Sequence, residues 1–86
     1  MEIEFSRSAV KTLQQMDKKT RDRIHCAIIG LTEIPPKGDI KQMAGTKETL
    51  YRLRVGGYRV IYCYNRKGEI TVLYVSDIGT RGGIYK

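Results

Sequence analysis

The residues best suited to chemistry in this sequence are arginines and tyrosines, and they gather in its second half. The segment 49–68 holds five basic residues and no acid, and all six tyrosines lie between residues 51 and 85. Guanidinium groups grip phosphate oxygens with two donors, and tyrosine rings stack on unpaired bases. The pattern favours a nucleic-acid surface. The alternative is a solvated sheet face in which tyrosine is an ordinary strand residue.

The usual catalytic groups of metal-dependent nucleases are missing from the sequence. It has one histidine, His25, which we expect to be structural, and no paired acids for metal-assisted phosphodiester cleavage. Cys26 and Cys63 are far apart, so we expect two small buried hydrophobic side chains rather than a disulfide or a zinc site. Asp77, the only acid among the last seventeen residues, is interpreted as structural. We therefore expect no metal and no cofactor.

Arginine and tyrosine can still support the cleavage of RNA. The ribose 2′-OH is a built-in nucleophile, so the protein need only align it with the neighbouring phosphate and stabilise the extra negative charge. Proton transfer is the weak step, because tyrosine titrates at about pH 10 and arginine above about pH 12. We expect such a protein to cleave free RNA slowly and to need a partner that aligns the substrate.

Hydrophobic periodicity and capping residues predict the elements that would position these groups. We expect a strand over residues 1–6, a helix that Ser6 or Ser8 caps, and a second helix that Asp17 or Thr20 caps. The double proline at 35–36 ends the second helix, and residues 37–46 are interpreted as a polar connection. From residue 50 the period changes to two, which predicts strands over 50–55, 58–64 and 69–78, joined by turns at 56–57 and 65–68.

These elements predict one α+β domain over residues 1–86. The order is strand–helix–helix–strand–strand–strand, with both helices packed on one face of a mostly antiparallel sheet. Arg52 and Arg54 alternate with apolar neighbours, so they would lie on the other, open face. No apolar stretch is long enough to span a membrane, and acids stand where a signal peptide needs basic and apolar residues. We expect a cytoplasmic protein with no membrane partner.

Two segments resemble the RelE/ParE superfamily of bacterial and archaeal toxins, and most closely its RelE-type mRNA interferases. They are Y-R-L-R-V-G-G-Y-R-V-I-Y at 51–62 and I-G-T-R-G-G-I-Y-K at 78–86. The resemblance implies the RelE-like fold and the toxin of a type II toxin–antitoxin system. Such a toxin cuts mRNA in the ribosomal A site by 2′-OH attack on the adjacent phosphate, which inhibits translation. It also implies a RelB-like antitoxin that wraps the toxin, and binding to operator DNA only through the antitoxin complex.

The same resemblance assigns roles to five residues. Arg52 and Arg54 would bind RNA, Arg59 would hold the scissile phosphate, Arg81 would stabilise the transition-state charge, and Tyr85 would stack on a base or orient the 2′-OH. Thr80 stands where many members carry His or Lys, so the group that transfers the proton is left open.

The site residues could have structural roles instead, and the protein could have a different function. Arg52 and Arg54 could be an exposed strand face, Arg59 could pair with Glu69 or Asp77, and Tyr85 could close the sheet edge. A ParE-type toxin, which poisons DNA gyrase by protein binding, is the alternative function. An inactive relative that only binds RNA or antitoxin is the third hypothesis.

Overall fold

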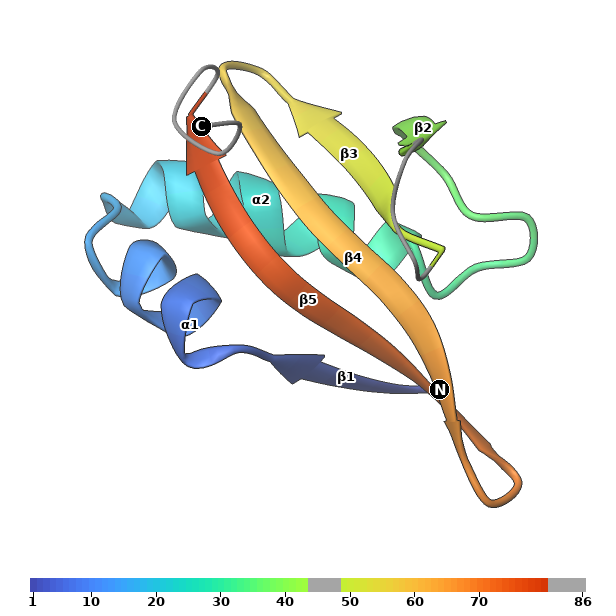
Figure 1. Cartoon of the computed structure of the whole chain (residues 1–86). Helices are drawn as coiled ribbons and strands as arrows, with labels where there is room; N and C mark the ends of the chain where they lie inside the picture. The colour runs from blue at the N-terminus through green and yellow to red at the C-terminus, as the bar shows by residue number, and fades with distance from the viewer. Residues whose placement is uncertain (44–48, 81–86) are drawn as a thin grey trace.

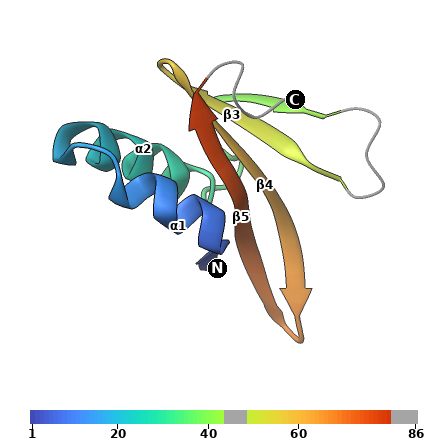
Figure 2. The same ribbon diagram turned by 60° about the vertical axis from the view of Figure 1, so that its left-hand side comes forward.

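The chain folds into one sheet with two helices on one of its faces. The computed structural model describes residues 1–43 and 49–80. In chain order the elements are β1 (Glu2–Phe5), α1 (Arg7–Gln14), α2 (Lys18–Gly30), β2 (Asp39–Gln42), β3 (Tyr51–Val55), β4 (Tyr58–Lys67) and β5 (Ile70–Thr80) (Figure 1). Seen from the side, both helices cover the same face of the sheet and leave the other face without a helix (Figure 2). The predicted α+β class and the single helical layer are confirmed.

Two local hydrogen bonds explain where the helices begin. The Oγ of Ser6 accepts from the backbone N–H of Ala9 at 3.0 Å, and the carboxylate of Asp17 accepts from the N–H of Thr20 at 3.2 Å. Each side chain satisfies one of the donors that the first turn of a helix leaves without a partner. Of the two predicted candidates for each cap, the structure therefore selects Ser6 and Asp17. Hydrogen bonding by Thr20 lowers the pKa of Asp17.

The sheet has five strands in the order β1-β5-β4-β3-β2, with β1 parallel to β5 and the other neighbours antiparallel. The sequence prediction missed β2, because Asp39–Gln42 lies inside the expected polar connection. Four residues are too few to show a period, and this strand is defined by its pairing with β3. The second predicted turn was also misplaced. β4 continues through Asn65 to Lys67, and Gly68 takes the positive φ of 64° that the tight turn requires.

The core lies between the helices and the sheet. The helical side of the core consists of buried residues from α2 and its C-cap: Ile24, Ile28 and Leu31. They pack against buried residues of the three central strands: Leu53, Val60, Tyr62, Leu73 and Val75. Cys63 is buried as expected, whereas Cys26 is exposed on α2, so the prediction of a buried side chain was wrong there. Neither helix of the described residues is long and apolar enough to cross a membrane.

Most of the described tyrosines face the helices and not the open face. Tyr51, Tyr62 and Tyr64 form one cluster, with ring centroids 5.5–6.0 Å apart. The Tyr64 hydroxyl donates to the backbone carbonyl of Leu31 at 2.8 Å, which satisfies an acceptor at the end of α2. Burial raises the pKa of both Tyr62 and Tyr64. These rings hold α2 on the sheet, so they are not available to stack on bases.

Candidate nucleic-acid interface

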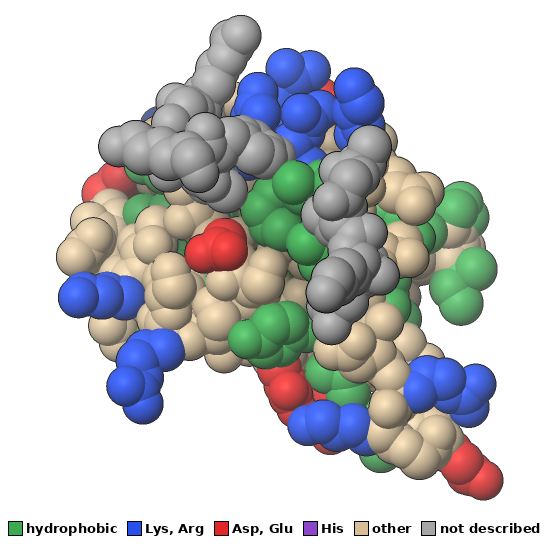
Figure 3. Space-filling view, in the orientation of Figure 1, with side chains coloured by type: hydrophobic (Ala, Val, Ile, Leu, Met, Phe, Trp, Pro, Cys, Tyr) green, Lys and Arg blue, Asp and Glu red, His purple; other side chains and the backbone are tan. Residues whose placement is uncertain are grey.

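The predicted basic residues of the two central strands lie together on the open face. Arg54 of β3 is directly opposite Arg59 of β4, and Arg52 is opposite Ile61. Their neighbours Leu53, Val55 and Val60 point into the core, so strand alternation directs the arginines away from the helices. Figure 3 looks onto this face and shows Lys and Arg side chains gathered over the ends of β3 and β4 near their connecting turn.

Asp39 holds one of these arginines in place. Nε of Arg54 donates to Oδ2 of Asp39 at 2.9 Å, and both side chains are about half exposed, at 48% and 56%. Two cations directly opposite each other in a sheet repel, so the carboxylate offsets part of the cost of the Arg54–Arg59 pair. The pair still leaves a positive surface on which an anion can bind.

Strand β2 adds a cation that the sequence analysis did not single out. Lys41 is paired with Arg52, so it lies on the same face, beside the arginines of β3. The segment 37–46 was expected to be a connection, and an alternating strand pattern cannot be recognised in four residues. Four cations, Lys41, Arg52, Arg54 and Arg59, therefore lie together on the open face across three strands, and Lys67 lies on the same face toward the other end of β4.

Arg52 has a buried donor atom that an anion could engage. Its Nε is buried and has no hydrogen-bond partner among the described residues. A buried donor without a partner costs about 1–3 kcal/mol, and an anion that accepted from it would remove that cost. The side chain as a whole is only partly buried, so the guanidinium group remains accessible from the open face.

Arg59 lies opposite Gly79 of β5, which places no side chain over it. Glu69 lies beyond the other end of the β4–β5 ladder, next to the Lys67–Ile70 pair, so the register excludes the expected alternative of an Arg59–Glu69 pair. Asp77 is the diagonal neighbour of Arg59, opposite Ile61. Gly79 thus adds no side chain beside the guanidinium group.

A β-bulge determines which residues of β5 face Arg59. The register shifts between Ile61, opposite Asp77, and Tyr62, opposite Val75, so Ser76 is the extra residue. Val75 and Ile78 both pack in the core, although strict alternation would place them on opposite faces. The bulge therefore directs Asp77 and Gly79 toward the open face. The interrupted spacing of the apolar residues Leu73, Val75 and Ile78 is the trace of this bulge in the sequence.

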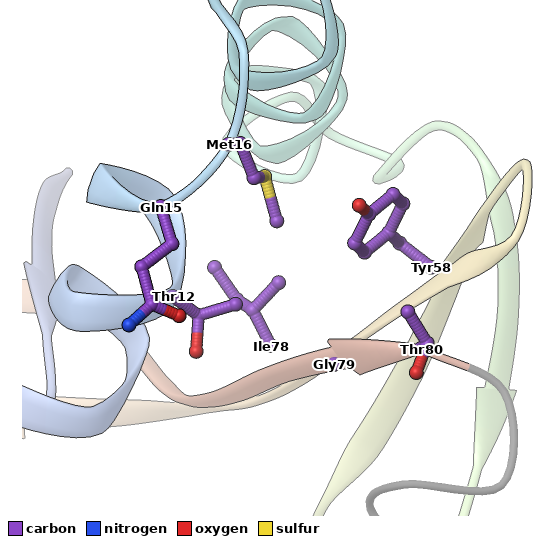
Figure 4. A pocket seen from close by; sticks show the side chains of 7 residues that line it. All are labelled: Thr12, Gln15, Met16, Tyr58, Ile78, Gly79 and Thr80. Atoms are coloured by element: carbon purple, nitrogen blue, oxygen red, sulfur yellow. The ribbon is translucent and has the colours of Figure 1, made fainter.

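A hollow of about 390 Å³ lies on the helix side of the same strand ends. The side chains of Met16, Tyr58 and Ile78 point into it, and Thr12, Gln15, Gly79 and Thr80 complete its wall (Figure 4). Tyr58 and Thr80 are paired across the ladder, next to the Arg59–Gly79 pair. Thr80 therefore lines this hollow and does not join Arg59 on the open face.

Two predicted site residues, Arg81 and Tyr85, lie outside the described residues, as do residues 44–48. His25 is exposed on α2, in the helical layer. Within residues 1–43 and 49–80 no group of three His, Cys, Asp or Glu side chains could hold a metal ion. The chemistry of the described face is thus that of cations and a few carboxylates.

Comparisons with known proteins match the whole described fold. The model of a family described as the ParE toxin of type II toxin–antitoxin systems, parDE, matches residues 3–85. The chain is similar to the archaeal RelE in the RelE–RelB complex from Pyrococcus horikoshii OT3, with 32% identity and a TM-score of 0.71 over 95% of this chain and 96% of that one. A comparison with curated proteins found none that matches significantly.

Two further structures have the same fold. The RelB–RelE antitoxin–toxin complex from Methanococcus jannaschii matches with 27% identity and a TM-score of 0.67 over 95% of this chain and 94% of that one. A YoeB/ParE toxin from Agrobacterium tumefaciens has a TM-score of 0.75 at 17% identity, over 93% of this chain and 98% of that one. The last likeness concerns the fold alone.

Proposed function

This chain belongs to the ParE toxin family, within the RelE/ParE superfamily of type II toxin–antitoxin systems, and on that premise we propose that it is a ribosome-dependent endoribonuclease. It would cut mRNA in the ribosomal A site and thereby inhibit translation. The observation that carries the proposal is the Arg54–Arg59 pair on an open sheet face, flanked by Arg52 with its unsatisfied Nε. Guanidinium groups in this arrangement suit a phosphate backbone.

The proposed reaction needs little covalent chemistry from the protein. The 2′-oxygen attacks the adjacent phosphorus, the bond to the 5′-oxygen breaks, and the products are a 2′,3′-cyclic phosphate and a 5′-hydroxyl. Arg59 would hold the scissile phosphate, opposite Gly79, which carries no side chain. Arg52, Arg54 and Lys41 would hold the neighbouring phosphates. Arg81 and Tyr85, outside the described residues, keep their proposed roles in stabilising charge and in stacking on a base.

Dependence on the ribosome follows from what the described face lacks. Four of the five described tyrosines face the helices, so the described part of the open face offers cations but few stacking surfaces for bases. A cationic sheet can neutralise charge, yet it does not by itself fix the in-line geometry that 2′-OH attack requires. We infer that the ribosome supplies this alignment by holding the codon.

The partner that neutralises the toxin is proposed to be a RelB-like antitoxin. The P. horikoshii and M. jannaschii structures are complexes of RelE with RelB. The formal charge of +7 and the open basic face favour an acidic segment that would cover the arginines. The antitoxin complex would also be the form that binds operator DNA.

Poisoning of DNA gyrase is the alternative function, and the ParE description of the matching family favours it. The two functions can be separated in cells that express the toxin briefly. An mRNA interferase stops the incorporation of labelled methionine and leaves cuts within codons, which primer extension maps. A gyrase poison instead produces double-strand breaks and the DNA-damage response while mRNA stays intact. We expect the first result, and the second would reject the proposal.

A further inference from the structure

The bulge in β5 brings a carboxylate, that of Asp77, into the basic face. Asp77 is opposite Ile61 and is the diagonal neighbour of Arg59, which is opposite Gly79. Diagonal neighbours on one face of an antiparallel pair have their Cα atoms about 7–8 Å apart, within reach of long side chains. A phosphate held by Arg59 would therefore have the Asp77 carboxylate beside it.

Three hydrogen bonds stabilise the bulge that orients Asp77. The Oγ of the bulged residue Ser76 donates at 3.2 Å to the carbonyl of Ile61, on the strand opposite the bulge. The Oγ of Ser6 donates to the carbonyl of Ser76 at 2.6 Å, and the N–H of Ser6 donates to the carbonyl of Val75 at 2.9 Å. Bulges often redirect a side chain next to an active site. Without this one, strand alternation would turn Asp77 toward the core.

The Asp77 carboxylate is not fully engaged in the folded chain. It is exposed, and the Ser8 hydroxyl donates to it at 3.4 Å, which is long for a hydrogen bond between oxygens. None of the ion pairs within residues 1–43 and 49–80 includes it. Asp39, on the same face, is bound to Arg54 at 2.9 Å, and Glu4 of β1 is bound to Lys67 at 2.8 Å. Asp77 is thus the carboxylate next to Arg59 that can accept a proton.

The reaction needs a group that takes a proton at neutral pH, and a carboxylate can do so where arginine and tyrosine cannot. The 2′-OH must lose its proton as it attacks, and both arginine and tyrosine hold their own protons at neutral pH. A carboxylate on a phosphate-binding face lowers the affinity for RNA through repulsion, which is a cost unless it takes part in the reaction.

We propose that Asp77 is the general base of the reaction, an inference that rests on the proposed ribonuclease function. Its carboxylate takes the proton of the 2′-OH while the 2′-oxygen bonds to phosphorus. The bond from phosphorus to the 5′-oxygen breaks, and that oxygen takes a proton from water. Asp77 then returns its proton to the solvent. The charged side chains that share its face on nearby strands are Arg59 of β4, Arg52 of β3 and Glu4 of β1, and α1 contributes the Ser8 hydroxyl.

The test is single-turnover cleavage of a defined mRNA on programmed ribosomes, measured from about pH 6 to pH 8.5. Loss of a general base lowers such rates by about 100-fold or more, which is the loss expected for Asp77→Asn at neutral pH. The wild-type rate should change little with pH above the titration of a carboxylate. The residual rate of Asp77→Asn should rise about tenfold per pH unit, because hydroxide then takes the proton.

Two variants exclude simpler explanations. Asp39→Asn removes another carboxylate of the face, so an effect of net charge alone would appear in both variants, whereas only Asp77→Asn should change the slope of the pH profile. Ser8→Ala removes the hydrogen bond to Asp77 and should keep the wild-type profile. If Asp77→Asn is folded and cleaves within about threefold of wild type with the same profile, Asp77 is not the base. If wild type does not cleave on ribosomes, the proposed function itself fails.

Discussion

Arg54 and Arg59 lie directly opposite each other on neighbouring antiparallel strands, on the face of the sheet that no helix covers. Two opposed cations destabilise a sheet, and Asp39 offsets part of this cost through its ion pair with Arg54. A local arrangement that works against stability is expected where a surface has a function. The proposed RNA binding rests on the positive charge of this Arg54–Arg59 pair.

Neutralising Asp39 should separate its effects on stability and on binding. Asp39→Asn removes the ion pair with Arg54, and because both groups are exposed the free energy of unfolding should fall by less than about 1 kcal/mol. The freed guanidinium group should bind single-stranded RNA more tightly at low salt. Urea denaturation and fluorescence anisotropy measure the two quantities. Weaker RNA binding by a folded variant would contradict this. It would mean that Asp39 helps binding more by orienting Arg54 than it hinders binding by repelling the phosphates.

Arg52 should contribute a phosphate contact that salt weakens. Arg52→Ala removes the buried Nε that lacks a partner, so it should not lower the free energy of unfolding much and should weaken RNA binding at every sequence. The slope of log K against log salt should become shallower by about 0.7, the value for one phosphate contact on a single strand. Arg66→Ala, at the far end of β4, is the matched control and should leave the slope unchanged. Equal slopes for all three proteins would remove Arg52 from the interface.

Ser6 should stabilise the fold through two elements at once. Its hydroxyl accepts from the N–H of Ala9 at the start of α1 and donates to the carbonyl of Ser76 in the bulge. Ser6→Ala should lower the free energy of unfolding by about 1–3 kcal/mol, measured by urea denaturation. Ser8→Ala, which loses an exposed and longer contact, should change it less. A Ser6 variant as stable as wild type would show that the bulge does not depend on this hydroxyl.

Asp17 should make stability depend on acidic pH. Hydrogen bonding by Thr20 lowers the pKa of Asp17 from its ordinary value of 3.8, so the folded state favours the ionised form. Its contribution is present above the unfolded pKa and is lost as the pH falls through the folded pKa. Asp17→Ala should thus be less stable than wild type at neutral pH, and the difference should shrink below about pH 4 in thermal scans. A difference that stays constant through acidic pH would contradict the prediction.

The sequence predicted the layers and the two faces of the central strands, because Arg52, Leu53, Arg54 and Val55 alternate cleanly. It could not predict β2, which is too short for a period and exists through its pairing with β3. It also missed the bulge, since the hydroxyl that supports Ser76 comes from Ser6, 70 residues earlier in the chain. These two features add Lys41 and Asp77 to the open face. Both depend on tertiary partners and not on local propensity.

The central claim is that Arg59 holds the phosphate that is cut on the ribosome. The most direct measurement is single-turnover cleavage of A-site mRNA by wild type, Arg59→Ala and the matched control Arg66→Ala, each shown to be folded. Removing a transition-state donor costs about 100-fold to 1,000-fold, so we expect that loss in Arg59→Ala and a rate near wild type in Arg66→Ala. Cleavage by Arg59→Ala at the wild-type rate would contradict the account, and so would a folded wild-type protein that leaves ribosome-bound mRNA intact.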